Sequence, residues 1–333
     1  MNIEFHYYMT KYLAIMAGFE NDEAETIAYS SQFVDDNKIR YEIEKPDGEI
    51  YKNYITQTMN ILKPKKNLMR IYLLYHFLPG DPTSYKASRR DGKMHVLMTT
   101  PASNHAQEIF FETTKTESLY ALGIATHMLA DSVSHQNFVG TFDEVNSMKG
   151  VWEKLTPDIG HADAGHLPDI PNLVWNDCRL IKSHAEIDNK ERLLLAAKKL
   201  YSNFLMITSN PSKWSTTKKT LNEIIGETIE EKELSKYEKQ KKERIEKIRE
   251  ILAEENVDEE YDRFKWLNDA VDIDVKLFND SKFRYDPVKD KLKFKKNFES
   301  SNWFKFQEAV REYQRTAMIK LEPILTQLEI KEW

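Results

Sequence analysis

The feature that most constrains this chain is an apolar segment that carries a stripe of polar side chains. Residues 115–135 read as a buried helix, within which His127, Asp131 and His135 follow one another at intervals of four. Positions four apart lie on one face of an α-helix, so the three side chains form a stripe over about 12 Å. Burying them is costly unless they are paired, and imidazole with carboxylate suits zinc and related divalent ions.

Small residues beside the stripe leave space for ions and substrate: Gly123, Ala130 and Ser134. The stripe predicts a metal site; the alternative is a set of hydrogen bonds inside a helical bundle.

Helical patterns account for most of the remaining chain. Gly and Pro number 10 and 11 among 333 residues, which is too few for a turn-rich β-sandwich. Apolar residues recur at helical spacing in most segments, and Asp22 with Glu25 is a candidate capping box for the second helix. Alternation around Pro46-Asp47-Gly48 within 38–56 indicates a small hairpin. Helices are expected at 5–17, about 22–36, 115–135, 186–206, 217–256 and 301–329, with an apolar run at 68–78 and a loop at 156–171. The sequence therefore predicts a mainly α fold, a multi-helix bundle with an inward-facing metal site and a small β-hairpin.

Length and charge suggest how the chain is organised. We expect residues 1–185 to form a metal-binding helical core and residues 186–333 a helical extension packed on it. The extension includes a charge-dense stretch at about 217–256 with a thin apolar stripe, typical of a solvated helix or helical hairpin. This stretch is a candidate surface for a protein partner. The net charge of −6 weighs against a broad nucleic-acid-binding surface.

The sequence also bears on localisation. Cys178 is the one cysteine, so no intrachain disulfide can form and we interpret it as structural. The first residues show no signal-peptide pattern, and no stretch has the length and apolarity of a membrane span. We therefore expect a cytoplasmic protein without an integral membrane segment.

A second cluster of candidate ligands follows the central helix. His161 and His166 lie five residues apart in a loop that also contains Asp163 and Asp169. Such a loop could deliver further metal ligands, although His, Asp, Gly and Pro are also common in surface loops. Elsewhere, candidate ligands lie at the start of the first helix, in the apolar run and at the end of the second helix: His6, His76 and Asp35. Taken singly, each is better interpreted as an ordinary side chain, a half-buried histidine or a carboxylate at a surface helix end.

Several catalytic classes are excluded by spacing. The chain has no HExxH motif of zincin proteases, no glutamate three residues before a histidine as in di-iron bundles, and no His-Asp dipeptide. Nucleophile-elbow, P-loop and dinucleotide-binding patterns are also absent from the sequence. His95 and His184 have no supporting neighbours and read as surface residues, and His105 stays undecided.

In the order of its motifs, the chain resembles the zinc-dependent phospholipase C and single-strand-specific nuclease superfamily. The resemblance covers residues 1–185 and rests on an early histidine, an aspartate ending a helix, a histidine in an apolar run, and then the HMLADSVSH helix followed by a histidine-bearing loop. The segments FHYYMTKYLA, IAYSSQFVDD, HFLPGD and HMLADSVSHQNFVG also resemble an uncharacterised bacterial family, which we interpret as a divergent branch of the same fold.

The resemblance implies three zinc positions. One would be held by Asp35, His76, His127 and Asp131. A second would be held by His135, His161 and a residue near 165–166. Because Gly165 stands where the superfamily has a carboxylate, His166 or Asp169 would substitute, and His161 ranks above His166. The third would be held by His6, a shared oxygen of Asp131 and the chain's N-terminus, for which Glu4 is a candidate replacement.

The function implied is metal-dependent hydrolysis of a phosphoester or phosphodiester, with two or three zinc ions and a metal-activated water. Asp35 would act as the general base. Candidate substrates are phospholipid head groups, single-stranded nucleic acid and small phosphodiesters. The alternative function is a non-catalytic, metal-stabilised helical protein that binds a protein partner through residues 217–256.

Overall fold

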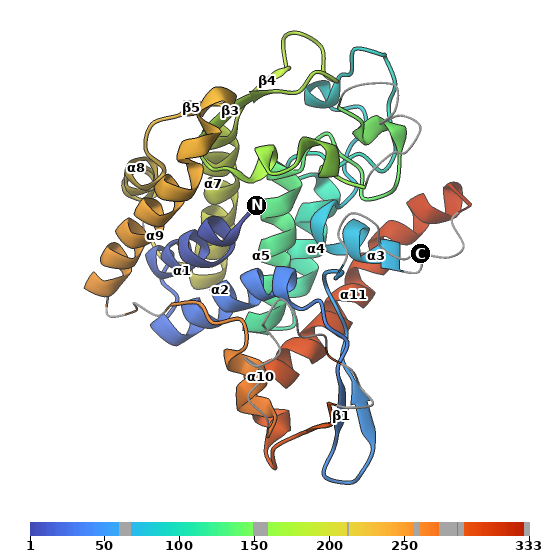
Figure 1. The fold of residues 1–333 in the computed structure, drawn as a ribbon, viewed down its shortest axis with the longest axis vertical. Coiled ribbons are helices and arrows are strands. Elements are labelled where there is room, and N and C mark those ends of the chain that lie inside the picture. Colours follow the sequence, from blue (N-terminus) through green and yellow to red (C-terminus); the bar gives the residue numbers. More distant parts are fainter. Residues whose placement is uncertain are drawn as a thin grey trace.

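The computed structural model describes the chain except residues 60–67, 149–158, 212, 256, 258–259, 273–284, 286–289 and 330–333. The fold is mainly helical, as the sequence predicts, with α5 (Leu119–Ser134) at its centre (Figure 1). Around α5 pack α2 (Asn21–Asp36), α4 (Asn104–Thr114), α7 (Asn189–Thr208) and α11 (Asn302–Gln327). Since α5 is enclosed by these helices, its polar stripe points into protein rather than solvent.

The remaining helical segments connect and cover this centre. They are η1 (Glu4–Met9), α1 (Thr10–Met16), α3 (Met69–Ile71), η3 (Tyr72–His76), η4 (Tyr85–Ala87), η5 (Glu144–Asn146), η6 (Ala162–Ala164), η7 (Leu167–Asp169), α8 (Trp214–Ile225), η8 (Glu231–Lys236), α9 (Tyr237–Glu254), α10 (Lys265–Ala270) and η10 (Phe298–Ser300). Within the described residues, no helix combines the length and apolarity needed to cross a membrane.

The start of α2 differs from the expected capping box. The box is formed two residues earlier, by Glu20 and Glu23, which bond each other's backbone N–H groups. Glu25 has other partners, because it accepts from the Tyr7 hydroxyl at 2.9 and 3.0 Å and pairs with Lys11 at 2.7 Å. The predicted box was therefore wrong because the carboxylate is used in a tertiary contact.

Two small sheets flank the helices. The expected hairpin is confirmed as β1 (Glu42–Glu44) and β2 (Ile50–Lys52), and β6 (Leu292–Lys293) adds a parallel strand to β1. The sequence reading missed a second sheet, in which β3 (Leu173–Asn176) lies between β4 (Glu186–Asp188) and β5 (Ile229–Glu230). Its strands have four, three and two residues, too short for a pattern of period two to be visible.

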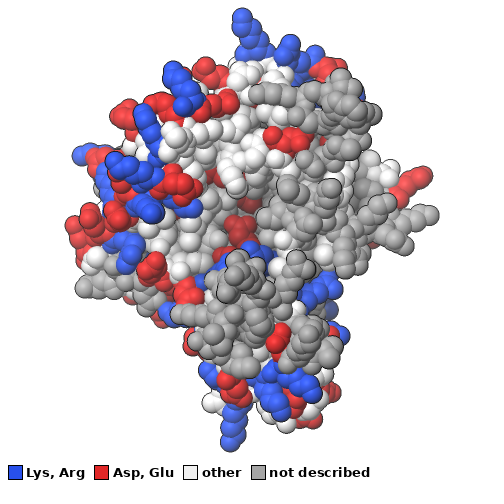
Figure 2. Space-filling model, viewed as in Figure 1, with Lys and Arg blue, Asp and Glu red and all other residues white. Residues whose placement is uncertain are grey.

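The charge-dense stretch forms α8, η8 and α9, in agreement with the expected helical hairpin. On α9 the buried side chains are Arg244, Ile248 and Leu252, which repeat every four residues. Figure 2 shows basic and acidic side chains intermixed along the edge of the molecule where Figure 1 places α8 and α9, so this surface carries no field of a single sign.

The predicted division at residue 185 stays a prediction, but contacts cross it extensively. Strand β4 begins at Glu186 and pairs with β3 on the other side of the boundary. One continuous cluster of buried apolar side chains reaches from Phe5 to Leu325. The C-terminal half therefore shares the core that encloses α5.

A single glycine sets how closely α2 approaches α5. A β-carbon on Gly123 would lie 2.4 Å from the β-carbon of Ser30 and 2.5 Å from the carbonyl oxygen of Ile27. Gly123 is one turn before His127, and Ile27 is two turns before Asp35, so this contact brings the two candidate ligands toward each other. No larger residue fits here without moving a helix.

Gly123→Ala is expected to destabilise the protein despite the better helix propensity of alanine. Overpacking costs about 1–3 kcal/mol, and alanine recovers about 1 kcal/mol of helix propensity. Chemical unfolding would measure the net loss. A variant that is more stable than the parent would mean that α2 and α5 do not pack closely at this position.

Candidate metal centre

Four side chains from three elements converge beside α5. Asp35 lies in the last turn of α2, His76 ends η3, and His127 and Asp131 lie one turn apart on α5. His76 Nδ1 and His127 Nε2 are 3.2 Å apart, and each is 3.1–3.2 Å from Asp131 Oδ2. Asp35 Oδ1 lies 3.8 Å from both ring nitrogens. Asp35, His76 and His127 thus form one compact group of candidate ligands, and Asp131 Oδ2 contacts the same two ring nitrogens.

Backbone carbonyls fix which ring nitrogens face the Asp131 carboxylate. His127 Nδ1 donates to the carbonyl of Ser31 at 2.8 Å, and His76 Nε2 donates to the carbonyl of Thr56 at 3.0 Å. A neutral imidazole with its proton there presents a bare lone pair at the other nitrogen. Two lone pairs and a carboxylate oxygen then meet with spacings close to the edge of a zinc tetrahedron, about 3.3 Å for bonds of 2.0–2.1 Å. Such acceptors repel one another unless a cation lies between them, so the donor set fits a metal ion.

A second group is built the same way from the end of α5 and the 160–169 loop. His135 Nε2 lies 3.2 Å from Asp169 Oδ1, and His161 Nε2 lies 3.5 Å from Asp169 Oδ2. Their other ring nitrogens donate to the carbonyls of His76 and Gly165, at 2.9 and 2.8 Å. In each ring the carbonyl contact fixes one nitrogen, so the other nitrogen faces the Asp169 carboxylate. Histidines that bind metal ions in proteins are usually oriented in this way.

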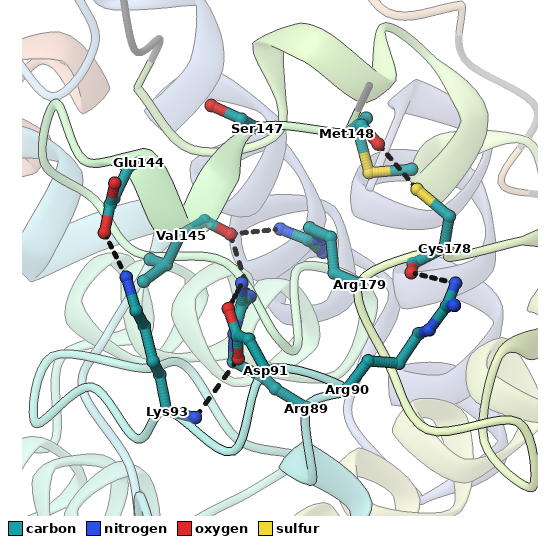
Figure 3. Close-up of a pocket in the computed structure, with 10 residues that line it drawn as sticks. All are labelled: Arg89, Arg90, Asp91, Lys93, Glu144, Val145, Ser147, Met148, Cys178 and Arg179. Atoms are coloured by element: carbon teal, nitrogen blue, oxygen red, sulfur yellow. Dashed lines mark hydrogen bonds and ion pairs between the residues drawn. The ribbon is translucent and has the colours of Figure 1, made fainter. Parts of the chain in front are cut away.

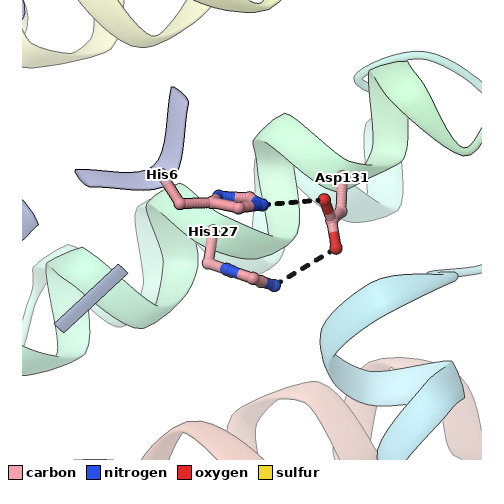
Figure 4. Close-up of side chains that lie close together, drawn as sticks. All are labelled: His6, His127 and Asp131. Atoms are coloured by element: carbon pink, nitrogen blue, oxygen red, sulfur yellow. Dashed lines mark hydrogen bonds and ion pairs between the residues drawn. The ribbon is translucent and has the colours of Figure 1, made fainter. Parts of the chain in front are cut away.

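His6 completes a third group with His127 and Asp131 (Figure 4). Its ring stacks on that of His127 with centroids 3.9 Å apart, and its Nε2 lies 3.1 Å from Asp131 Oδ1. His6 Nδ1 is buried and has no hydrogen-bond partner within the described residues. Asp131 therefore directs one oxygen to His6 and the other to the first group, which is the arrangement of a carboxylate shared between two ions.

The amino group of Met1 lies among these side chains. It pairs with Asp131 Oδ1 and is 3.2 Å from His135 Nε2 and 3.3 Å from Asp169 Oδ1. Burial alone would lower the pKa of this amino group, but Asp131, Asp169 and Asp35 raise it to about 10. A positive charge at this place offsets part of the negative charge of the carboxylates.

Two carboxylates of the candidate centre, those of Asp131 and Asp169, stay ionised. Burial alone would raise the pKa of Asp131, but His135, the Met1 amino group, His127 and His6 hold it well below its usual range. Burial likewise opposes ionisation of Asp169, but the Met1 amino group and contacts with His161 and His135 lower the pKa of this carboxyl. Ionised carboxylates are the form that binds metal ions.

The surroundings of the histidines shift their pKa values in different directions. Burial lowers the pKa of His135 to about 4, and burial, His127 and Met1 lower the pKa of His6 well below its usual value. Burial also acts to lower the pKa of His76, but the nearby carboxylates of Asp131 and Asp35 raise it. Burial raises the pKa of Asp35 itself. His6 and His135 are thus neutral ligands near neutral pH.

Most of the residues expected from the sequence meet in these three groups. Seven of the eight predicted ligands take part: His6, Asp35, His76, His127, Asp131, His135 and His161. His166 has an exposed side chain and belongs to none of the groups found among the described residues. The third member of the second group is Asp169 instead. It is one of the two residues, with His166, that the sequence offers as substitutes at Gly165.

Glu4 faces away from the centre. Its carboxylate pairs with Arg244 of α9 at 2.5 Å, and both side chains are buried. Asn2 joins the same network by donating to Glu4 at 2.9 Å and to the carbonyl of Asp169 at 3.0 Å. The network links α9, the N-terminal segment that carries His6, and the loop that carries Asp169. Nothing local in the sequence indicates that Glu4 pairs with a residue 240 positions away.

Comparison with known proteins identifies the family of the chain. Residues 1–321 match the Family of unknown function (DUF6765), and the chain belongs to that family. The matched range contains all three His/Asp groups. Neither the curated proteins nor the solved structures gave a match.

Acid is expected to destabilise the protein through His135. Its pKa is about 4 in the folded chain and about 6.5 in an exposed histidine, so the unfolded chain binds more protons between these values. Stability therefore falls as pH drops from about 6.5 to about 4, by up to about 3 kcal/mol for this side chain. A bound metal ion acts in the same direction, because it requires neutral imidazole.

His135→Gln should remove this part of the pH dependence. Urea unfolding of the variant and the parent at about pH 7 and about pH 4.5 would measure the difference in slope. If both proteins lose the same stability on acidification, His135 is not held neutral by burial.

Proposed function

We propose that this protein is a zinc-dependent phosphoester or phosphodiester hydrolase, a divergent relative of the phospholipase C and single-strand-specific nuclease superfamily. One observation carries the proposal. Ring nitrogens of His76 and His127 and one oxygen of Asp131 meet at 3.1–3.2 Å, and a backbone carbonyl holds the other nitrogen of each ring. A set that combines imidazole nitrogens with carboxylate oxygens favours zinc over calcium or magnesium, which prefer oxygen ligands alone.

The order of the ligands along the chain supports the family relationship. The ligands occur as His6, Asp35, His76, the His127–Asp131–His135 helix, and then the 161–169 loop, which is the order that the superfamily resemblance implies. The folded chain brings these separated segments to adjoining positions. Asp131 contacts the first and third groups, and the Met1 amino group lies between Asp131 and Asp169. A phosphate ester would then lie against more than one positive centre.

Bound zinc would supply Lewis acidity toward a phosphoryl oxygen and would lower the pKa of a water molecule. Asp35 is the carboxylate best placed to handle that water. Its side chain is 28% exposed, against 1% for Asp131 and 14% for Asp169. Its pKa is raised by burial, which makes it a stronger base than an ordinary aspartate. Asp35 would orient the water and accept its proton, while Asp131 stays ionised and holds the histidines in place.

His127→Ala tests the proposal most simply, because His127 belongs to two of the three groups. We expect the purified variant to lose bound zinc and at least about a hundredfold of its hydrolysis of a chromogenic phosphodiester. His166→Ala is the matched control and should keep both metal and activity. Elemental analysis and the rate before and after chelator treatment provide the two measurements.

The outcomes separate the competing functions. Zinc loss with loss of turnover in His127→Ala supports the hydrolase. A parent protein that holds zinc but hydrolyses no phosphoester among lipid, nucleotide and chromogenic substrates supports the non-catalytic, metal-stabilised interaction protein. Unchanged metal content in His127→Ala would refute the assignment of the centre.

A further inference from the structure

A pocket lies outside the His/Asp groups. It is a cavity of about 200 Å³ between the segment at Arg89–Lys93, the segment at Glu144–Met148, and Cys178 with Arg179 (Figure 3). None of its lining residues belongs to the candidate metal centre. Three arginines and a lysine line it, opposed by two carboxylates, those of Asp91 and Glu144.

Two of the arginines are rigidly held. Arg89 forks onto Asp91 at 2.9 and 3.0 Å, and Arg179 forks onto Asp177 at 2.6 and 2.9 Å. Both donate a further N–H to the carbonyl of Val145, at 3.0 and 3.1 Å, and the Arg179 guanidinium also lies 3.7 Å from the centre of the Phe138 ring. Each guanidinium has five N–H donors and uses one on each of its three nitrogens in these bonds. The N–H groups that are left over are therefore fixed in direction before any ligand binds.

The charge of the pocket is not balanced. Asp91, Asp177 and Glu144 neutralise Arg89, Arg179 and Lys93 respectively. Arg90 has no carboxylate partner in the described part of the chain; its guanidinium donates to the carbonyl of Cys178 at 3.4 Å. Arg90 is exposed at the pocket, so one unit of positive charge faces the cavity.

We propose that this pocket binds a phosphate group, with Arg90 as the principal ligand and the fixed guanidinium groups of Arg89 and Arg179 as supporting donors. Guanidinium forks match the oxygens of phosphate and form charge-assisted hydrogen bonds with them. A tetrahedral oxyanion presents oxygens in several directions, which suits donors from two separate segments better than a planar carboxylate does. The group is either free inorganic phosphate or the phosphate of a larger molecule.

Titration calorimetry of the full chain with inorganic phosphate tests this site. Arg90→Gln should weaken phosphate binding at one site about tenfold or more, which is the loss of one charge-assisted hydrogen bond pair. Glu144→Gln should strengthen binding several-fold, because it removes a competing carboxylate and releases Lys93. Lys182→Gln removes an exposed cation outside the pocket and should change nothing.

Two further titrants define the ligand. Phenylphosphonate carries a similar oxyanion on a larger group, through a bond to phosphorus that is not hydrolysed. If it binds more tightly than inorganic phosphate, the natural ligand is a phosphorylated molecule. If it binds more weakly, the ligand is the free phosphate ion. Acetate should bind at least tenfold more weakly than phosphate. Unchanged phosphate affinity in Arg90→Gln would overturn the proposal, and so would acetate binding as tight as phosphate binding. Loss of phosphate binding in Arg90→Gln, while the His/Asp centre still holds its metal, would support the proposal independently of the hydrolase activity.

Discussion

The structure depends on one buried carboxylate, that of Asp131. Its side chain is 1% exposed and stays ionised, so it requires positive charge close by. His6, His76, His127, His135 and the Met1 amino group surround it. These partners come from the N-terminal segment, from η3 and from α5 itself. Three parts of the chain are therefore tied to one point at the centre of the helical bundle.

The bundle places these groups by controlling backbone positions. Close packing of α2 on α5 at Gly123 puts the Ser31 carbonyl on His127 and brings Asp35 to the same side. Other carbonyls orient His76, His135 and His161 in the same manner. Because each contact fixes one ring nitrogen, the opposite nitrogen points to the carboxylates without needing a metal ion to orient it. The centre is thus preorganised by main-chain geometry, which lowers the cost of binding a cation.

Local patterns predicted the features that have local causes. The helix of His127 and Asp131, the hairpin at Pro46–Gly48 and the final helix each follow from periodicity or turn residues. Helix α4 was missed although Ala106, Ile109, Phe110 and Thr113 form a buried stripe at helical spacing. Strands β3, β4 and β5 could not be found, because each is too short to show a pattern and β5 joins β3 from a distant part of the sequence. The choice of Asp169 over His166, and the pairing of Glu4 with Arg244, likewise depend on how remote segments fold together.

Anomalous X-ray diffraction from crystals of the zinc-containing protein is the most direct test of the central claim. The account predicts one zinc peak within about 2.5 Å of His76 Nδ1 and His127 Nε2, and another within about 2.5 Å of His161 Nε2. His166 should lie outside the coordination distance of every peak. Crystals grown with zinc that show no anomalous peak beside Asp131 would contradict the account.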